Sequence, residues 1–110
     1  MLRKIELPKV ETTMADGVFI KQMVCQKAGT IIEQHVHAYD HTLLIGVGSF
    51  RVWKDGVHLG DFKAPKPLMI EAGTKHMLKS LEDNSIAYCI HNVSRTGEVE
   101  VLPSEQLLRV

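Results

Sequence analysis

The fold is decided by residues 29–48, GTIIEQHVHAYDHTLLIGVG, where three of the chain's six histidines lie between two glycines. His35 and His37 are two positions apart, so on a β-strand both imidazoles project from the same face. His41 follows four positions later and precedes the apolar run Leu43–Val47. This spacing predicts a strand with apolar side chains on one face and reactive imidazoles on the other.

A fourth histidine extends the pattern. His76 lies 35 residues beyond His41, directly after the tight turn Ala72–Thr74. Neutral imidazoles that converge from different strands are good ligands for Fe, Mn, Co, Ni, Cu and Zn. We therefore predict one divalent transition metal ion, held by three or four of the imidazoles of His35, His37, His41 and His76. A pair of acid–base histidines that works without a metal is the main alternative.

Short runs of alternating apolar residues, separated by turn residues, continue on both sides of this stretch. The runs are Val18–Gln26, Ile31–His37, Leu43–Lys54, Val57–Leu59, Leu68–Ile70, Met77–Leu81 and Ile86–Val93. Asp55-Gly56 between two such runs predicts a hairpin, and the glycines at 46 and 48 predict a bulge or bend. Ala64–Pro67 is predicted to be a loop because proline cannot donate to a central ladder. A weak helical turn is predicted only at Pro103–Leu108.

Many short strands predict an all-β sandwich or barrel with little helix. The length of 110 residues fits a single domain over residues 1–110. A formal net charge of zero argues against nucleic-acid partners and against a polybasic membrane anchor. The first residues hold no apolar signal-peptide core, and Cys25 and Cys89 indicate buried thiols more than a disulfide framework. We expect a cytoplasmic protein.

The spacing of residues 29–48 resembles the first motif of the cupin superfamily, G-x5-H-x-H-x3-4-E-x6-G. Gly29, His35, His37 and Gly48 occupy their expected places, and His41 stands where the family has a metal-binding Glu. The second motif, G-x5-P-x-G-x2-H-x3-N, is matched more loosely. Gly73 and His76 are intact, whereas Glu71 replaces the Pro, Ser80 replaces the Asn, and Gly60 lies ten residues before position 71.

The resemblance implies a double-stranded β-helix, or jelly-roll barrel, of antiparallel strands with the metal inside one end. It implies His35, His37 and His76 as metal ligands. His41 either completes a four-histidine site or stands aside from a three-histidine site, and Asp40 is an alternative acceptor for an imidazole N–H. Cupins commonly pair as dimers, so we expect a homodimer, with a strand at Arg3–Leu7 available to join a partner's sheet.

The predicted function is that of a metal-dependent enzyme acting on a small oxygenated organic molecule. A non-heme oxygenase of the dioxygenase type is the first choice, and a non-redox isomerase or lyase is the alternative. A non-catalytic ligand-binding or sensor module is the third hypothesis, because cupins host many chemistries on one scaffold. Tyr39 and His91 are the candidate catalytic residues. Trp53 is expected to pack in the barrel and His58 to be solvated.

Overall fold

The computed structural model describes residues 6–33 and 36–93 of the chain. All nine of its elements are strands, and every pairing between them is antiparallel. They are β1 (Lys9–Ala15), β2 (Val18–Cys25), β3 (Ile31–Glu33), β4 (His41–Val47), β5 (Ser49–Lys54), β6 (Val57–Lys63), β7 (Lys66–Ile70), β8 (His76–Ser80) and β9 (Ser85–Asn92). This confirms the predicted all-β class.

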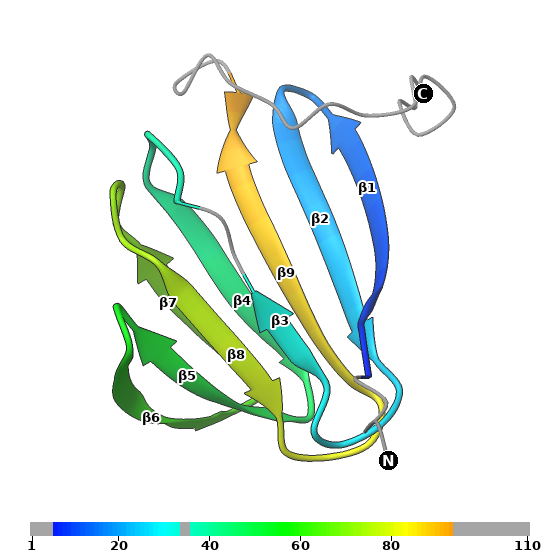
Figure 1. The fold of residues 1–110 in the computed structure, drawn as a ribbon. Helices are drawn as coiled ribbons and strands as arrows, with labels where there is room; N and C mark the ends of the chain where they lie inside the picture. Colours follow the sequence, from blue (N-terminus) through cyan, green and yellow to red (C-terminus); the bar gives the residue numbers. More distant parts are fainter. Residues whose placement is uncertain (1–5, 34–35, 94–110) are drawn as a thin grey trace.

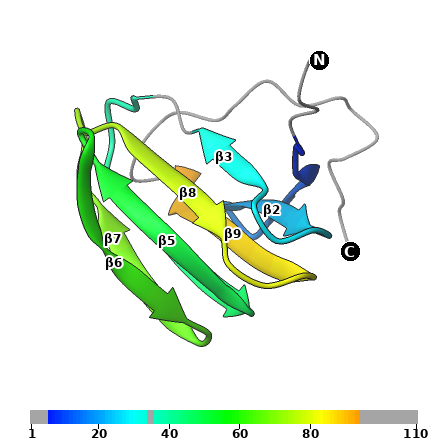
Figure 2. The same cartoon turned by 60° about the horizontal axis from the view of Figure 1, so that its bottom comes forward.

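The strands form two sheets that face each other (Figures 1 and 2). Sheet A has the order β1-β2-β9-β4-β7 and sheet B the order β3-β8-β5-β6. In Figure 1, β3 of sheet B lies in front of β4 of sheet A. Because the chain passes repeatedly from one sheet to the other, the two sheets together form the jelly-roll barrel expected from the sequence.

The passage from β4 to β5 shows why the run Leu43–Lys54 becomes two strands. The pairing of β4 with β9 shifts register between Ile45 and Val47, which is the predicted bulge. Gly48 follows at φ +75°, and a Cβ at this position would collide with the side chain of Ser85. Only glycine fits both requirements, so the chain turns here from sheet A into sheet B.

The core lies between the inner faces of the two sheets. Leu43 and Ile45 of sheet A and Phe50, Val52 and Leu78 of sheet B have no exposed surface. Inner and outer side chains alternate along β4, β5, β8 and β9, as a half-buried strand requires. The residues at the ends of these inward rows therefore point into the ends of the barrel.

One end of the barrel is closed by buried polar groups that satisfy one another. The hydroxyls of Thr30 and Ser80 both donate to the carbonyl of Lys27, at 2.6 and 3.0 Å. The Thr30 amide donates to the Ser80 hydroxyl at 3.0 Å. In this network each of the three donors has an acceptor, as expected for a well-packed end of the barrel.

Three sequence predictions need correction. Lys66 and Pro67, predicted to be loop, belong to β7, which tolerates proline because it is an edge strand of sheet A. β1 was not predicted, because only one of its side chains, that of Thr12, is buried and the pattern of apolar residues is weak. The strand expected at Arg3–Leu7 does not include Leu7, and Arg3 lies outside the described residues.

The Asp55-Gly56 hairpin between β5 and β6 is confirmed. Both turn residues have positive φ, +49° and +81°, as a type I′ turn demands. No helix among residues 6–33 and 36–93 has the length and apolarity needed to cross a membrane. The helical turn predicted at Pro103–Leu108 lies outside the described residues.

Candidate functional site

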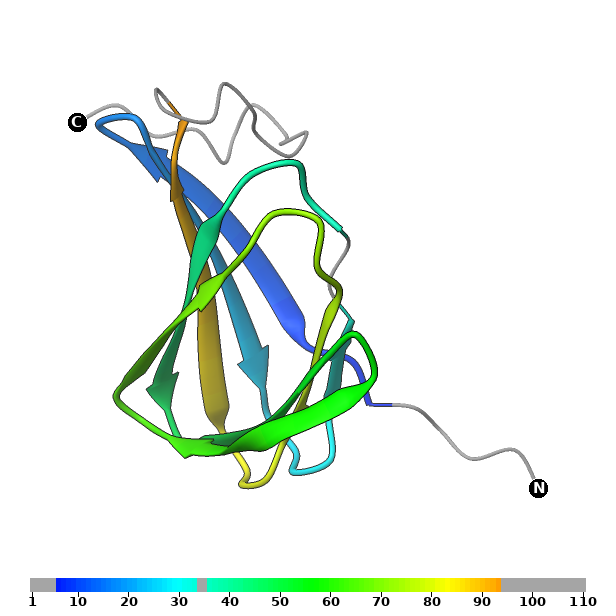
Figure 3. The same ribbon diagram turned by 90° about the vertical axis from the view of Figure 1, so that its left-hand side faces the viewer.

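Three segments meet at the open end of the barrel, which we call the mouth. They are the loop 36–40 before β4, the turn 71–75 before β8, and the last residues of β9 (Figure 3). The Gly73 amide donates to the His37 carbonyl at 2.9 Å, and the Ala72 amide donates to Asp40 Oδ1 at 2.7 Å. These bonds join the loop of the first histidine motif to the turn of the second.

His37 and His41 lie side by side at the mouth. Their ring centroids are 5.3 Å apart with perpendicular planes, and both ring nitrogens of His41 are shielded from solvent. Two imidazoles on one ion, each with a metal–nitrogen bond of about 2.1 Å at a tetrahedral angle, place their centroids about 5 Å apart. The centroid distance of this pair is therefore compatible with two ligands of one metal ion.

His76 points inward from the opposite wall, at the start of β8, and is 3% exposed. Burial lowers the pKa of His76 below its usual value, and the nearby charge of Lys54 lowers it further while Asp55 opposes this. The ring is therefore held neutral, which is the form that binds metals.

Thr74 fixes which nitrogen of His76 carries the proton. The Thr74 hydroxyl donates its one hydrogen to the Glu71 carbonyl at 2.7 Å, and the same oxygen lies 3.3 Å from Nδ1 of His76. A hydroxyl whose hydrogen is used can only accept, so Nδ1 is the protonated nitrogen and Nε2 carries the lone pair. The sequence analysis missed this residue, although its position two before His76 is a usable signal.

The structure describes three of the four predicted metal ligands, His37, His41 and His76. His35 lies outside the described residues. Within the described part of the chain, no three His, Cys, Asp or Glu side chains form a group that could hold a metal ion. His76 borders a cavity of about 290 Å³ with Trp53 and Met77, whereas His41 borders the larger cavity at the mouth. The described residues thus include two imidazoles in contact, those of His37 and His41, and a third, that of His76, on the facing sheet.

The strand expected at Ile31–His37 is shorter than predicted. β3 ends at Glu33, and His37 belongs to the loop before β4. The argument that places His35 and His37 on one face of a strand therefore does not apply to His37. The loop brings His37 to His41 by folding back on β4, with its carbonyl tied to Gly73.

The two candidate catalytic residues, Tyr39 and His91, do come together. Their rings lie 4.4 Å apart, and His91 also packs against Phe19 at 4.9 Å. His91 is 6% exposed and points inward from β9, which places it in the pocket and not on the surface. The Tyr39 ring stacks on His37 at 4.8 Å and so connects His91 to the histidine pair.

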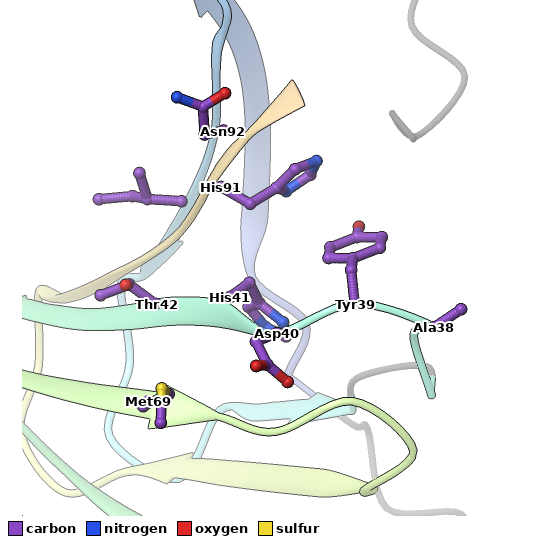
Figure 4. A pocket seen from close by; sticks show the side chains of 9 residues that line it. Ala38, Tyr39, Asp40, His41, Thr42, Met69, His91 and Asn92 are labelled. Carbon is purple, nitrogen blue, oxygen red and sulfur yellow. The ribbon is translucent and has the colours of Figure 1, made fainter. Parts of the chain in front are cut away.

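A cavity of about 410 Å³ opens between these residues (Figure 4). It is lined by Ala38, Tyr39, Asp40, His41, Thr42, Met69, Ile90, His91 and Asn92. His91 and Tyr39 approach each other across one side of the opening, with Asn92 on the far side of His91. The described lining contains imidazole, phenol, hydroxyl and amide groups and the carboxylate of Asp40, but no Lys or Arg, so it suits a small polar molecule that is bound by hydrogen bonds and not by a positively charged side chain.

The carboxylate of Asp40 accepts the Ala72 amide through Oδ1 and so holds the two mouth loops together. A bond from an imidazole N–H to Asp40 stays a prediction. His58 is exposed and forms a pair with Asp61 at 3.3 Å, as expected for a solvated residue. Trp53 does not enter the core. It is half-buried on the outer face of sheet B, where its ring lies 6.0 Å from that of His58.

Cys25 and Cys89 are buried free thiols, as predicted. In the pairing of β2 with β9, Cys25 is opposite Ser85 and Cys89 is opposite Lys21. Four positions along a strand correspond to about 13 Å, far beyond the Cα separation that a disulfide spans. A bridge between them is excluded by this register.

Comparison with known proteins gives a consistent result at the level of the fold. No family model matches the chain, and no curated protein does. Among solved structures, an uncharacterized protein with a double-stranded β-helix domain from Klebsiella pneumoniae matches with a TM-score of 0.69 at 15% identity, over 87% of this chain and 85% of that one. An RmlC-like cupin family protein from Methanocaldococcus jannaschii matches with a TM-score of 0.64 at 15% identity, over 84% and 85%.

A third similar structure, KdgF from Halomonas sp., has a TM-score of 0.57 at 17% identity and covers 76% of this chain and 74% of that one. Sequence identities this low show that the architecture is shared, and they carry no information about activity. The two facing antiparallel sheets, the crossovers between them and the histidine-bearing loops at one end lead to the same conclusion. The chain has the cupin fold, a double-stranded β-helix.

Proposed function

We propose that this protein is a metal-dependent enzyme that acts on a small oxygenated organic molecule bound at the mouth of the barrel. The observation that carries the proposal is the contact of four rings, those of His37, Tyr39, His41 and His91, beside one open cavity. Titratable aromatic groups that cluster at the open end of a barrel with an apolar core favour a catalytic role for these residues over a purely structural one.

In this proposal His35, His37, His41 and His76 hold one divalent transition metal ion. The 5.3 Å spacing of the His37 and His41 rings supports a shared ion, and so does the free Nε2 lone pair assigned to His76. When bound, such an ion supplies Lewis acidity that polarises an oxygen of the substrate. The imidazole donor set is compatible with Fe, Mn, Ni, Cu, Co or Zn.

Tyr39 and His91 hold and move protons in this proposal. His91 is fixed between Phe19 and Tyr39, so its ring cannot turn freely when a substrate enters. A neutral imidazole has one N–H and one lone pair, and a phenol both donates and accepts. The pair is therefore able to take a proton from one atom of the substrate and to donate one to a neighbouring oxygen.

Two reaction types follow from these groups. The Tyr39–His91 pair in a polar cavity favours proton transfer within the substrate, as in an isomerase or lyase. The dioxygenase-type reaction predicted from the sequence needs open coordination positions, and four protein ligands on an octahedral ion would leave two, enough for a bidentate substrate or for substrate and dioxygen. We place the proton-transfer reaction first because its residues are in contact in the structure.

The experiment begins with elemental analysis of protein purified without added metal. Oxygen uptake is then measured with a panel of diketones, catechols and keto acids, and hydrogen exchange of the same compounds in deuterated water is followed by NMR. Exchange without oxygen uptake supports an isomerase or lyase, and oxygen uptake supports the dioxygenase. His91→Asn should abolish the activity that is found, whereas His58→Asn, which alters an exposed imidazole, should not.

Metal binding is tested separately. His76→Ala should fold but bind metal at least about tenfold more weakly, because one of the proposed ligands is removed. His58→Ala is the matched control. Unchanged stoichiometry and affinity in His76→Ala, or wild-type protein that takes up no metal at all, would overturn the proposed site.

A further inference from the structure

A second cavity lies on the side of the barrel, between β1 and β2 of sheet A and β3 of sheet B. It has a volume of about 560 Å³, within the range of about 300–1,000 Å³ that is usual for small-molecule sites, and we call it the side cavity. It shares none of its described lining residues with the cavity at the mouth. Its apolar walls are formed by Leu7, Pro8, Val10, Met23, Ile31 and Ile32.

The side cavity results from a mismatch between the two sheets. β1 is an edge strand of sheet A and β3 is an edge strand of sheet B, and no strand pairing joins the two among residues 6–33 and 36–93. β3 has three residues, whereas β1 has seven and β2 has eight. Sheet B therefore covers only part of the inner face of β1 and β2.

Val10 shows the effect of this partial cover. It is on the same face of β1 as the buried Thr12 and is opposite the buried Met23, yet it is 46% exposed. Leu7, just before β1, is 73% exposed. The deeper walls at Met23 and Ile32 are buried. An apolar ligand that covers such exposed aliphatic surface removes it from water, which is favourable.

The described lining of the side cavity contains one basic group. Lys21 reaches it from β2, in an inward row whose other members, Phe19, Met23 and Cys25, are buried. The lysine is half-buried, and lysine is uncommon at such positions. An ammonium group has three N–H donors, so it can bind a carboxylate in addition to the interactions that Lys21 already has.

Glu33, the last residue of β3, is the other charged residue of this lining. It is exposed, whereas Lys21 is half-buried, so the negative charge is on the solvent side of the positive one. A carboxylate at Glu33 repels a second carboxylate on a ligand. The two charges therefore favour a ligand with a single negative group.

We propose that the side cavity binds an aliphatic monocarboxylate of medium chain length, such as octanoate. The carboxylate pairs with Lys21, and the hydrocarbon chain covers Val10 and contacts Met23 and Ile32. The described walls contain no aromatic ring, so a flexible chain suits them better than a flat ring that gains from stacking. The site is separate from the mouth, and the proposal does not depend on the proposed enzyme activity.

The location of the ligand is tested by NMR of the full-length protein with ¹³C-labelled methionine methyl groups, assigned by Met→Leu variants. Each cavity has its own reporter: Met23 lines the side cavity, Met69 the mouth, and Met77 the cavity beside His76. Titration with octanoate should shift the Met23 methyl signal in a saturable way and leave the other two unchanged. No saturable shift of Met23, or a larger shift at Met69 or Met77, would overturn the proposal.

The role of the ammonium is tested by calorimetric titration. Lys21→Gln should bind octanoate at least tenfold more weakly because a charge-assisted bond is lost, and Lys21→Arg should retain binding. Lys79→Gln is the matched control, since Lys79 is also a half-buried lysine on a strand but lies on sheet B. Circular dichroism verifies that each variant is folded. Equal affinity of the wild type and Lys21→Gln, or equal losses in Lys21→Gln and Lys79→Gln, would refute the pairing.

The ligand class is tested with related compounds. Octanol has the same chain without the charge, so it should bind more weakly than octanoate and be insensitive to Lys21→Gln. Each methylene contributes about fourfold in affinity, so hexanoate should bind about fifteenfold more weakly than octanoate. Octanedioate should also bind more weakly, because Glu33 opposes its second carboxylate. Octanol or octanedioate that binds as tightly as octanoate, or hexanoate of equal affinity, would exclude an aliphatic monocarboxylate site.

Discussion

The amide of Gly73 donates a hydrogen bond to the carbonyl of His37, and this 2.9 Å contact joins the two loops that carry the candidate ligands. Gly73 adopts φ +78°, a conformation that costs a side chain energy, so the turn is built to present its amide to the neighbouring loop. The position of His37 is thus linked to that of His76, three residues after Gly73. We therefore expect a change in one of these loops to alter the position of the other.

Asp40→Ala tests this unit. The variant removes the acceptor of the Ala72 amide and should lower the free energy of unfolding by about 1 kcal/mol. It should also weaken metal binding, because the two loops are no longer held together. Asp83→Ala is the control, since Asp83 accepts the Ala28 amide in a 2.8 Å bond outside the mouth. Urea unfolding and metal titration are measured for both. If both variants keep the wild-type affinity for metal, Asp40 has only a structural role.

Thr74→Val tests the proton assignment of His76. The Nδ1–H would lose its acceptor and the imidazole could adopt either tautomer, so metal affinity should fall about tenfold while the fold is retained. Thr74→Ser keeps the hydroxyl and should bind metal as the wild type does. NMR of the His76 ring nitrogens in the metal-free protein reports the tautomer directly. A protonated Nε2 in the wild type would refute the assignment.

His41 stands where the first cupin motif has a metal-binding Glu, and the variants His41→Glu and His41→Ala determine its role. If His41 is a ligand, His41→Glu should retain the metal but change its electronic or paramagnetic spectrum, because an anionic oxygen replaces a neutral nitrogen. His41→Ala should then lose most of its affinity. Indistinguishable spectra and affinities in the wild type and both variants would indicate a three-histidine centre.

Gly48→Ala should destabilise the fold far more than Gly56→Ala. Both glycines have positive φ, +75° and +81°, which costs an alanine about 1 kcal/mol in each case. At Gly56 nothing lies within 4 Å of the added Cβ, whereas at Gly48 it would collide with Ser85. We expect a loss of at least about 3 kcal/mol for Gly48→Ala. Thermal unfolding of the two variants measures the difference, and equal losses would show that the corner relaxes easily.

Cys25 should be unreactive in the folded protein. Burial raises the pKa of its thiol from 9.0 to about 11, so little thiolate forms at pH 8. Because the unfolded chain ionises at about 9 and the folded chain only at about 11, stability should decrease as the pH rises between these values. Alkylation followed by mass spectrometry is expected to label Cys25 only in denaturant. Rapid labelling of the native protein would show that this part of the core opens frequently.

The sequence predicted those features that depend on local pattern. Alternation predicted β4, β5, β8 and β9, and Asp55-Gly56 predicted its hairpin, because period and turn chemistry act over a few residues. It did not predict β1, where burial is slight, nor that His37 lies in the loop before β4 instead of on a strand. The contact of Tyr39 with His91 joins two distant segments, and no local pattern encodes that distance. The sequence did not predict that Thr74 accepts a hydrogen bond from His76, because this role depends on the direction of the Thr74 hydroxyl hydrogen.

The position of β9 in sheet A has a consequence for synthesis of the chain. β9 is the last described strand in the sequence, yet it lies in the middle of the sheet, with β2 on one side and β4 on the other. Until residues 85–92 have left the ribosome, both neighbours have open edges that can pair with another nascent chain. The barrel cannot close before β9 is available, so folding should be slow, and loss of β9 should leave hairpins that aggregate.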